Sequence, residues 1–282
     1  MEIIAGIVLY NPDVDRLKEN IEAIAHQVDK LVFIENGSIR LDYIDEINCK
    51  NGVFIYNKEN LGIAHALNQI LNYAANNNYE WALTLDQDSV ASPNLIQVFA
   101  KYVRKDIGII CPKVLDRNFS VEADNDIRPL VEVNECITSG SLTNVEAWKK
   151  YGGFDDQMFI DWVDWDFCYG LKKIGYRIVK TNETSILHEL GENTRTMQIF
   201  GKERLVIHRP PFRTYYIHRN MVYLWRKHKC PSFRGLLYVE LLTLYISLRF
   251  DTNKFSNLLA ALKGVSHGLV MSIHVQNPIL KC

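Results

Sequence analysis

The chain of 282 residues lacks the features that mark several common classes of protein. Its 32 Lys and Arg nearly balance its 33 Asp and Glu, so no overall field favours a nucleic acid partner. No G-x-G-x-x-G follows the first apolar run, which argues against a dinucleotide oxidoreductase. The cysteines show no C-x-x-C pair and no zinc-knuckle spacing. We therefore expect free thiols in a reducing cytosol at Cys49, Cys111, Cys136, Cys168, Cys230 and Cys282.

Long apolar segments and targeting signals are also missing. The longest apolar stretch, residues 236–248, contains Glu240 and is shorter than the roughly 20 residues that a membrane span needs. The apolar run 3–9 has no basic flank and no cleavage site, so we interpret it as a buried first strand. We expect a cytoplasmic protein that is peripheral at the inner face of the cell membrane.

Up to about residue 112 the chain alternates short apolar runs with helical patterns. This alternation predicts an α/β fold with a mostly parallel central sheet and helices on both faces. Ligands of such sheets bind beyond the carboxyl ends of the strands. The predicted strands are 3–9, 31–34, 53–56, 81–85 and 108–111, and the predicted helices are 13–27, 62–75 and 93–103, the last with proline at its first position.

The regular alternation of apolar runs and helical patterns ends after residue 113. We predict a strand at 131–137 that runs into residues 138–141, and a final strand at 177–179. Helices are predicted at 145–151 and 164–174, and amphipathic helices follow the Pro210-Pro211 pair. We therefore divide the chain into a catalytic domain, 1–205, and a C-terminal helical region, 206–282. That region would associate with a membrane or form a homodimer.

The triplet Asp86-Gln87-Asp88 follows a predicted buried strand. Two carboxylates at the ligand edge of a sheet suit Mg²⁺ or Mn²⁺, which bind hard oxygen ligands together with phosphate oxygens. An ordinary strand-to-turn junction would also contain Asp and Ser. His188, in the segment 186–192, follows the last predicted strand and could complete the cation site.

Polar residues also follow the second and third predicted strands. Glu35 and Asn36 could bind a base edge or ribose hydroxyls, although an Asn-Gly turn is the simpler interpretation. Small residues around Gly62, next to Asn60, keep the first turn of a helix slim, so either a ligand or a packed strand can approach it.

Three acidic residues, Asp161, Asp164 and Asp166, interleave with Trp162 and Trp165 around a predicted helix start. Helix capping would explain carboxylates here. The alternative is a general base seated against aromatic walls, whose exclusion of water raises a carboxyl pKa towards a useful value. The density of Trp and Asp favours the second interpretation.

The stretch between Glu203 and Glu240 has no acidic residue and many aromatic ones. Mixtures of this kind suit phosphate and membrane interfaces, and we favour an anionic lipid or a lipid diphosphate over a merely solvated basic face. Its basic residues include Arg209, Arg213, Arg219, Arg226, Lys227, Lys229 and Arg234.

Taken in order, these segments resemble glycosyltransferase family 2, the large inverting family with the GT-A fold, and are most similar to bacterial rhamnosyltransferases of O-antigen and capsule synthesis. The resemblance spans nearly the whole chain. It rests on residues 8–12, 35–38, 60–64, 85–89, Ser139-Gly140, 152–155, 161–166, Arg219-Asn220 and 262–269.

The resemblance implies a metal-dependent inverting glycosyltransferase that uses Mn²⁺ or Mg²⁺. Its donor would be dTDP-β-L-rhamnose, and its acceptor a glycan or a polyprenyl-diphosphate-linked acceptor. The implied nucleotide-sugar site is Tyr10, Asn11, Glu35, Asn36, Asn60, Gly62, Asp86, Gln87 and Asp88. The implied acceptor site is Gly140, Trp162 and Asp166. Arg219 would bind phosphate, Asp88 and His188 the metal, and Asp164 would be the catalytic base.

Two positions depart from the family pattern. Glu35 stands where many members have Asp, and Val163 replaces a Glu that commonly precedes the base, which leaves Asp161 and Asp166 as alternatives to Asp164. Two other functions remain open at this stage. They are transfer from another dTDP- or UDP-hexose, and a non-catalytic nucleotide-binding module.

Overall fold

The computed structural model describes residues 2–47, 49, 52–117, 126–189, 195–199, 201–206, 209–250 and 253–274. Residues 190–192 and Cys282, which entered the sequence interpretation, lie outside these ranges.

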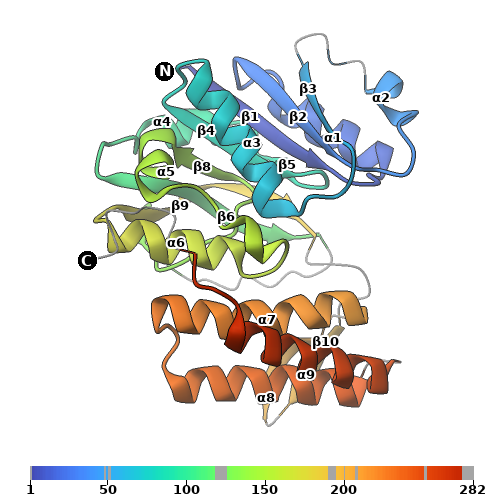
Figure 1. The fold of residues 1–282 in the computed structure, drawn as a ribbon. Helices are drawn as coiled ribbons and strands as arrows, with labels where there is room; N and C mark the ends of the chain where they lie inside the picture. Colours follow the sequence, from blue (N-terminus) through green and yellow to red (C-terminus); the bar gives the residue numbers. More distant parts are fainter. Residues whose placement is uncertain are drawn as a thin grey trace.

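A sheet of nine strands forms the centre of the described part (Figure 1). Along the sheet the order is β3-β2-β1-β4-β8-β6-β9-β5, and β7 pairs with β9. The strands are β1 (Ile3–Leu9), β2 (Lys30–Asn36), β3 (Gly52–Asn57), β4 (Trp81–Asp86), β5 (Val90–Ala91), β6 (Ile107–Asp116), β7 (Leu130–Glu132), β8 (Ser141–Asn144) and β9 (Arg177–His188). A separate hairpin pairs β10 (Arg195–Ile199) with β11 (Lys202–Val206).

The first four strands of the sheet are parallel, as the sequence predicts. Leu9 pairs with Glu35 and Val8 pairs with Asp86, so the carboxyl ends of β1, β2 and β4 lie at one edge. The apolar side chains of β1 alternate between the two faces of the sheet, and all seven residues are buried. The prediction of a mostly parallel α/β sheet is confirmed.

The second half of the sheet differs from the prediction. The chain forms only the short β7 where we expected a strand over 131–137, and β8 follows after Gly140. β8 runs antiparallel to both β4 and β6 and lies between them. Its residues are polar apart from Leu142 yet all are buried, so no apolar run reveals it. The predicted strand 177–179 is the start of the longer β9.

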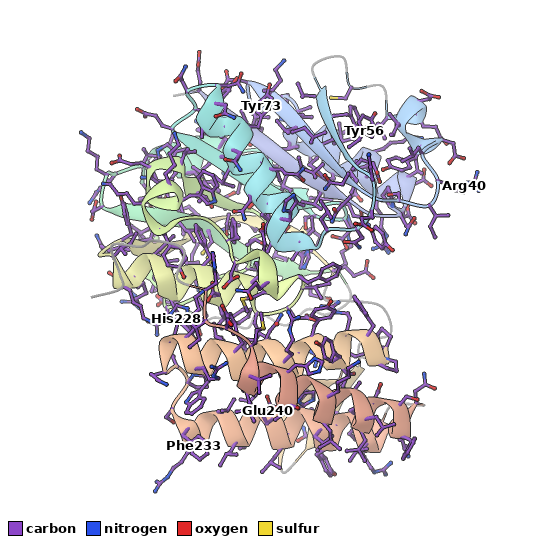
Figure 2. All side chains as sticks on the ribbon, viewed as in Figure 1. Arg40, Tyr56, Tyr73, His228, Phe233 and Glu240 are labelled. Atoms are coloured by element: carbon purple, nitrogen blue, oxygen red, sulfur yellow. The ribbon has the colours of Figure 1, made fainter. Side chains whose placement is uncertain are left out.

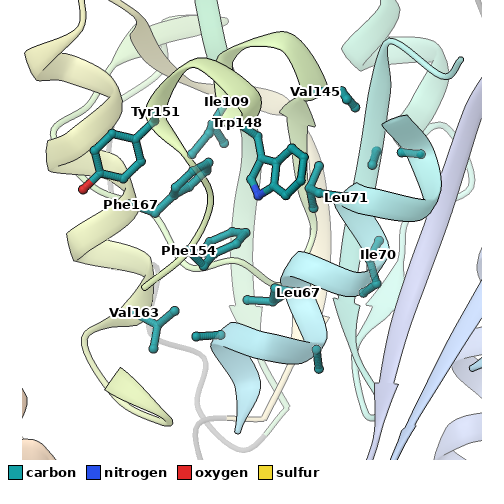
Figure 3. Packing of buried hydrophobic residues seen from close by; sticks show 14 of the residues in the cluster. Leu67, Ile70, Leu71, Ile109, Val145, Trp148, Tyr151, Phe154, Val163 and Phe167 are labelled. Atoms are coloured by element: carbon teal, nitrogen blue, oxygen red, sulfur yellow. The ribbon is translucent and has the colours of Figure 1, made fainter. Parts of the chain in front are cut away.

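Helices cover both faces of the sheet. On one face α3, α5 and α6 enclose a core around Leu67, Trp148 and Phe167 (Figure 3). On the other face α1 and α4 pack through Leu17 and Phe99. The helices of this part are α1 (Val14–Ile24), α2 (Tyr43–Glu46), α3 (Ile63–Asn76), α4 (Leu95–Ala100), α5 (Val145–Tyr151) and α6 (Val163–Lys173), with a 3₁₀ turn at Asp156–Met158.

The helix starts follow local chemistry. Asp13 caps α1, because its side chain accepts hydrogen bonds from the backbone N–H groups of Asp15 and Arg16. The last long helices begin at Pro211, where the sequence predicts a helical region. By contrast, α4 begins at Leu95 and not at the predicted Pro93.

Three C-terminal helices pack beneath the sheet domain (Figure 1). They are α7 (Pro211–His228), α8 (Phe233–Phe250) and α9 (Lys254–Val270). α9 approaches α7 closely through Gly264 and Gly268. A Cβ atom at these positions would lie 2.5 Å from the carbonyl oxygen of Tyr215 and 2.4 Å from that of Arg219. No helix in the described ranges combines the length and apolar character needed to cross a bilayer.

The contact between α5 and α6 depends on a glycine. A Cβ at Gly170 would lie 2.0 Å from the ring of Tyr151, which is itself buried. We expect Gly170→Ala to lower the free energy of unfolding by about 1–3 kcal/mol, because the added methyl overpacks the core. Urea denaturation would measure this change. Ser266→Ala, on an exposed position of α9, serves as the control and should change stability by less than about 0.5 kcal/mol.

Candidate active site

Three metal-binding side chains meet at the carboxyl edge of the sheet. Asp86 ends β4, Asp88 follows it, and His188 ends β9. One ligand atom from each lies within 4.8 Å of those of the other two. His188 Nε2 is 3.9 Å from Asp86 Oδ2, and His188 Nδ1 is 3.7 Å from Asp88 Oδ1. The sequence placed these residues at strand ends, and the structure brings them together.

The surroundings of this cluster fit a divalent cation. Asp88 Oδ1 is buried and accepts no hydrogen bond from the described protein atoms, which is unusual for a carboxylate oxygen. His188 Nδ1 lies 2.8 Å from the Ser89 hydroxyl, and this contact orients the ring, as polar neighbours commonly do for metal-binding histidines. Two carboxylates and one imidazole form a donor set that Mn²⁺ accepts.

The charges around Asp86 oppose each other. Burial raises the pKa of Asp86, the nearby imidazole of His188 lowers it, and the neighbouring Asp88 carboxylate raises it again. Arg213, from the first turn of α7, also lowers it. The backbone fixes the residue as well, since the Ser139 hydroxyl accepts from the Asp86 N–H at 2.9 Å. A divalent cation would favour the ionised carboxylates further.

The ends of β1 and β2 form a neighbouring polar wall. Gln87 joins it to the cluster, because its side-chain oxygen accepts from the Tyr10 N–H at 2.9 Å. The carboxylate of Glu35 is buried and accepts from the backbone N–H groups of Gly37 and Ser38 at 3.1 and 2.7 Å. Glu35 therefore shapes the turn after β2.

The side chains of Asn36 and Asn60 also form hydrogen bonds within the protein. Asn36 Oδ1 accepts from Asn57 Nδ2 at 2.9 Å and from the Leu61 N–H at 3.1 Å, and Asn60 Oδ1 accepts from the Gly62 N–H at 2.9 Å. These bonds hold the loop before α3. Tyr10 and Asn11 remain exposed at the rim, and the Asn11 side chain accepts from the Ile39 N–H.

Position 62 requires a glycine because the backbone of Phe159 lies very close to it. Its φ is +87°, and a Cβ there would lie 2.6 Å from the carbonyl oxygen of Phe159. That carbonyl accepts from the Ile63 N–H at 2.6 Å. The loop that precedes α6 is thereby joined to the start of α3. Gly140, with a φ of +74°, similarly packs against the Ile186 side chain.

The loop before α6 has an unusual backbone. Phe159, Asp161 and Trp162 all have positive φ, at 57°, 65° and 65°. Non-glycine residues adopt this conformation at a cost and keep it only where the surroundings impose it. Asn220 of α7 imposes it here. Its side-chain amide donates to the carbonyl oxygens of Met158, Ile160 and Asp161 at 2.6, 2.7 and 3.0 Å.

The three acidic residues that follow have different environments. Asp161 forms an ion pair with Arg213. Asp164 forms no ion pair within the described ranges, and its side chain accepts only from the Trp165 N–H. Burial raises the pKa of Asp164 to about 8, and the negative charge of Asp161 contributes to the same direction. Among the three, Asp164 alone has the properties expected of a general base.

Asp166 is fully buried, so its carboxylate is not accessible to a sugar acceptor. Its carboxylate lies 2.9 Å from Lys227 Nζ and 2.8 Å from His228 Nε2, both on α7 (Figure 2). Lys227 also contacts the buried Asp155 at 2.7 Å. Burial by itself raises the pKa of Asp166, but the His228 and Lys227 contacts outweigh it and hold the pKa below its ordinary value. The expectation that Asp166 binds a sugar is therefore wrong, because this carboxylate joins α6 to α7.

Two arginines of α7 lie near the acidic loop. The Arg219 guanidinium donates to the Gln157 carbonyl and lies over the Tyr216 ring, 4.5 Å from its centroid. Arg219 therefore holds the loop before α6. Arg213 forms an ion pair with Asp161, and the negative charge of Asp86 also acts on it. In the sequence, Arg213 stands out only as one member of the basic stretch.

Trp162 keeps the position predicted for it beside the acidic segment. Its ring packs edge-on against Trp165, with centroids 5.4 Å apart, and its indole N–H donates to the Ile217 carbonyl at 3.1 Å. In the same region Cys136 Sγ lies 3.9 Å from Cys168 Sγ, and the five described cysteines form no disulfide.

The mostly parallel sheet with an Asp-x-Asp cluster at its carboxyl edge has the GT-A fold, and solved glycosyltransferase structures share this fold. The mannosyltransferase PcManGT from Pyrobaculum calidifontis, solved in complex with GDP-Man and Mn²⁺, has a TM-score of 0.59 at 12% identity, covering 99% of this chain and 78% of that one. GalNAc-T7, solved with UDP, GalNAc and Mn²⁺, has a TM-score of 0.64 at 10% identity, covering 96% of this chain and 56% of that one.

Sequence comparison gives the family. The model of "Glycosyl transferase family 2" matches residues 5–162, more than half of the chain. The chain belongs to glycosyltransferase family 2. It is also similar to the dTDP-rhamnosyl transferase RfbF of Shigella flexneri, with 26% identity over 270 residues and 89% of each chain covered.

The buried ion pairs between α6 and α7 yield a stability prediction. Lys227→Met leaves two buried carboxylates, Asp155 and Asp166, without their shared cation. We expect a loss of about 3–5 kcal/mol in the free energy of unfolding, measured by urea denaturation. Lys229→Met, on an exposed residue at the end of the same helix, is the matched control. Equal stability of the two variants would contradict the structural role of Lys227.

Proposed function

We propose that the chain is an inverting rhamnosyltransferase. It would move L-rhamnose from dTDP-β-L-rhamnose to a hydroxyl of a lipid-linked glycan in cell-surface polysaccharide synthesis. The observation that carries the choice of donor is the 26% identity to a dTDP-rhamnosyl transferase over 89% of both chains. The strand-end cluster Asp86, Asp88 and His188 supports the placement of the diphosphate.

The nucleotide would lie along the carboxyl edge of β1, β2 and β4. Tyr10 and Asn11 are exposed at this edge, and the turns held by Glu35 and Asn36 shape its floor. Asp86 and Gln87 would line the diphosphate side. Asp88 and His188 would hold Mn²⁺ or Mg²⁺, with Asp86 beside them. When bound, the cation would neutralise charge that develops on the departing diphosphate.

Asp164 would act as the general base. As the acceptor oxygen forms its bond to the anomeric carbon, the Asp164 carboxylate accepts the hydroxyl proton, and the bond from that carbon to the diphosphate oxygen breaks. Arg213 pairs with Asp161, and the charges of Arg213 and Asp86 act on each other. Arg213 is therefore placed to offset negative charge on the leaving group, whereas Asp161 is neutralised and poorly suited to accept a proton. Gly140 and Trp162 would line the acceptor side.

Substitution of Asp164 tests whether the rate of sugar transfer can be lost while nucleotide binding is kept. Asp164→Asn should lower the rate of transfer by about 10²–10⁴-fold, because the amide cannot accept the proton. Nucleotide affinity, measured by calorimetry, should stay within about twofold of the wild type, since the diphosphate site is elsewhere. An equal loss of binding and transfer in this variant would assign the base to another residue.

The raised pKa of Asp164 gives a dependence on pH. Transfer should increase as the pH rises through about 8, because the carboxyl holds its proton below that value. Stability should show the opposite trend. The folded state binds this proton more tightly than the unfolded state. The protonated Asp164 carboxyl therefore contributes to the free energy of unfolding at low pH, and this contribution is lost as the pH rises from about 4 to 8. Asp164→Asn should therefore be more stable than the wild type at pH 9, as measured by thermal denaturation.

A thermal-shift panel of nucleotide sugars, with and without Mn²⁺, tests the donor and the metal site together. Stabilisation by dTDP-rhamnose should exceed that by UDP-hexoses and should increase with Mn²⁺. Asp88→Asn should weaken the Mn²⁺-dependent part by about tenfold or more in apparent affinity, while the exposed control Glu22→Gln should respond like the wild type. A larger shift with another nucleotide sugar would overturn the choice of rhamnose.

A further inference from the structure

Helix α8 is strongly apolar but is barely buried. Its 18 residues contain only three charged side chains, Arg234, Glu240 and Arg249. Only Leu236 and Ser247 are buried in the described structure. A helix with this composition normally lies inside a protein or against a lipid phase, because burial of its apolar area is what stabilises it. The described residues leave one side of α8 exposed.

The uncovered residues form one face of the helix. Leu237, Tyr238, Leu241 and Tyr245 recur at helical spacing, and Leu241 is 65% exposed. Glu240 lies on the opposite side, where it pairs with the buried His218 of α7 (Figure 2). The outward face of α8 is therefore apolar and aromatic and carries no acidic residue.

Basic side chains frame this face. Arg234 and Arg249 are exposed near the two ends of α8, and Phe233 is exposed at its start. Helix α9 adds a second exposed apolar stripe, formed by Phe255, Leu259 and Leu262. Aromatic rings and arginines beside aliphatic side chains are the composition of helices that lie in the plane of a membrane surface.

The exposed charges near α8 select the kind of surface. Lys229, Arg234, Arg249, Lys254 and Lys263 are exposed, whereas Glu240 is paired with His218. An anionic bilayer complements this charge. A twofold dimer through α8 would bring the same basic rim of two copies together, and like charges would oppose it.

We infer that the outward face of α8, with the stripe of α9 beside it, docks on an anionic lipid bilayer. The helix lies in the interface with Leu237 and Leu241 inserted among the acyl chains and the arginines at the headgroups. This inference depends on the proposed function only in its purpose, which is to bring the active site to a lipid-linked acceptor. The binding itself does not require transfer of a sugar.

Vesicle co-sedimentation tests the inference with the full chain. The wild type should bind vesicles of phosphatidylcholine with about 30% phosphatidylglycerol, and binding should weaken at high salt and on pure phosphatidylcholine. The double variant Leu237→Glu, Leu241→Glu should partition at least about tenfold more weakly. Ile127→Glu, on a residue of the sheet domain that is 95% exposed, is the matched control and should bind like the wild type.

Two further measurements show whether weaker vesicle binding by the double variant comes from misfolding. They also separate membrane binding from the proposed sugar transfer. Thermal denaturation and nucleotide affinity of the double variant should match the wild type, since α8 lies away from Asp86 and Asp164. Equal sedimentation of the double variant and wild type would overturn the inference. So would a wild type that ignores anionic vesicles and forms a dimer, by light scattering, that the double variant abolishes.

Discussion

The ammonium group of Lys227 lies between two buried carboxylates, and much of the active-site geometry depends on this contact. Asp155 precedes the 3₁₀ turn and Asp166 lies in the first turn of α6, so the single cation fixes both ends of the segment that contains Asp161 and Asp164. Both carboxylates are shielded from water. A buried charge without a partner is costly, so the three groups require one another. Helix α7 is thereby an integral part of the candidate active site.

Asn220 extends this dependence to the backbone. Between Asp155 and Asp166 the chain adopts three positive φ values at non-glycine residues, and the amide of Asn220 holds the carbonyl groups of that loop. Without these bonds the segment would relax towards a more common conformation. The position of the proposed base is therefore set by a helix that begins 47 residues after it, at Pro211.

The sequence was sufficient where local chemistry decides structure. The apolar run of β1, the cap at Asp13 and the carboxylates after β4 each follow from short-range rules, and parallel strands bring Asp86 and Asp88 to one edge. It failed where a distant partner decides. Asp166 has the same local pattern as Asp164, and only the presence of Lys227 and His228, about 60 residues away, makes it structural. β8 was missed because the buried Ser141, Thr143 and Asn144 are polar, and their environment is supplied by β4 and β6.

Helix α7 is attached to the sheet domain through Lys227 and Asn220, and these contacts affect how the chain can be divided. By sequence, residue 205 is a natural boundary between a catalytic domain and a tail, but a fragment cut there would lose both Lys227 and Asn220. By contrast, α8 contributes little to the core beyond Leu236. α9 packs directly on α7 through Gly264 and Gly268, so it belongs to the same unit. The exposed face of α8 is the part that evolution or an engineer could change in order to retarget the enzyme.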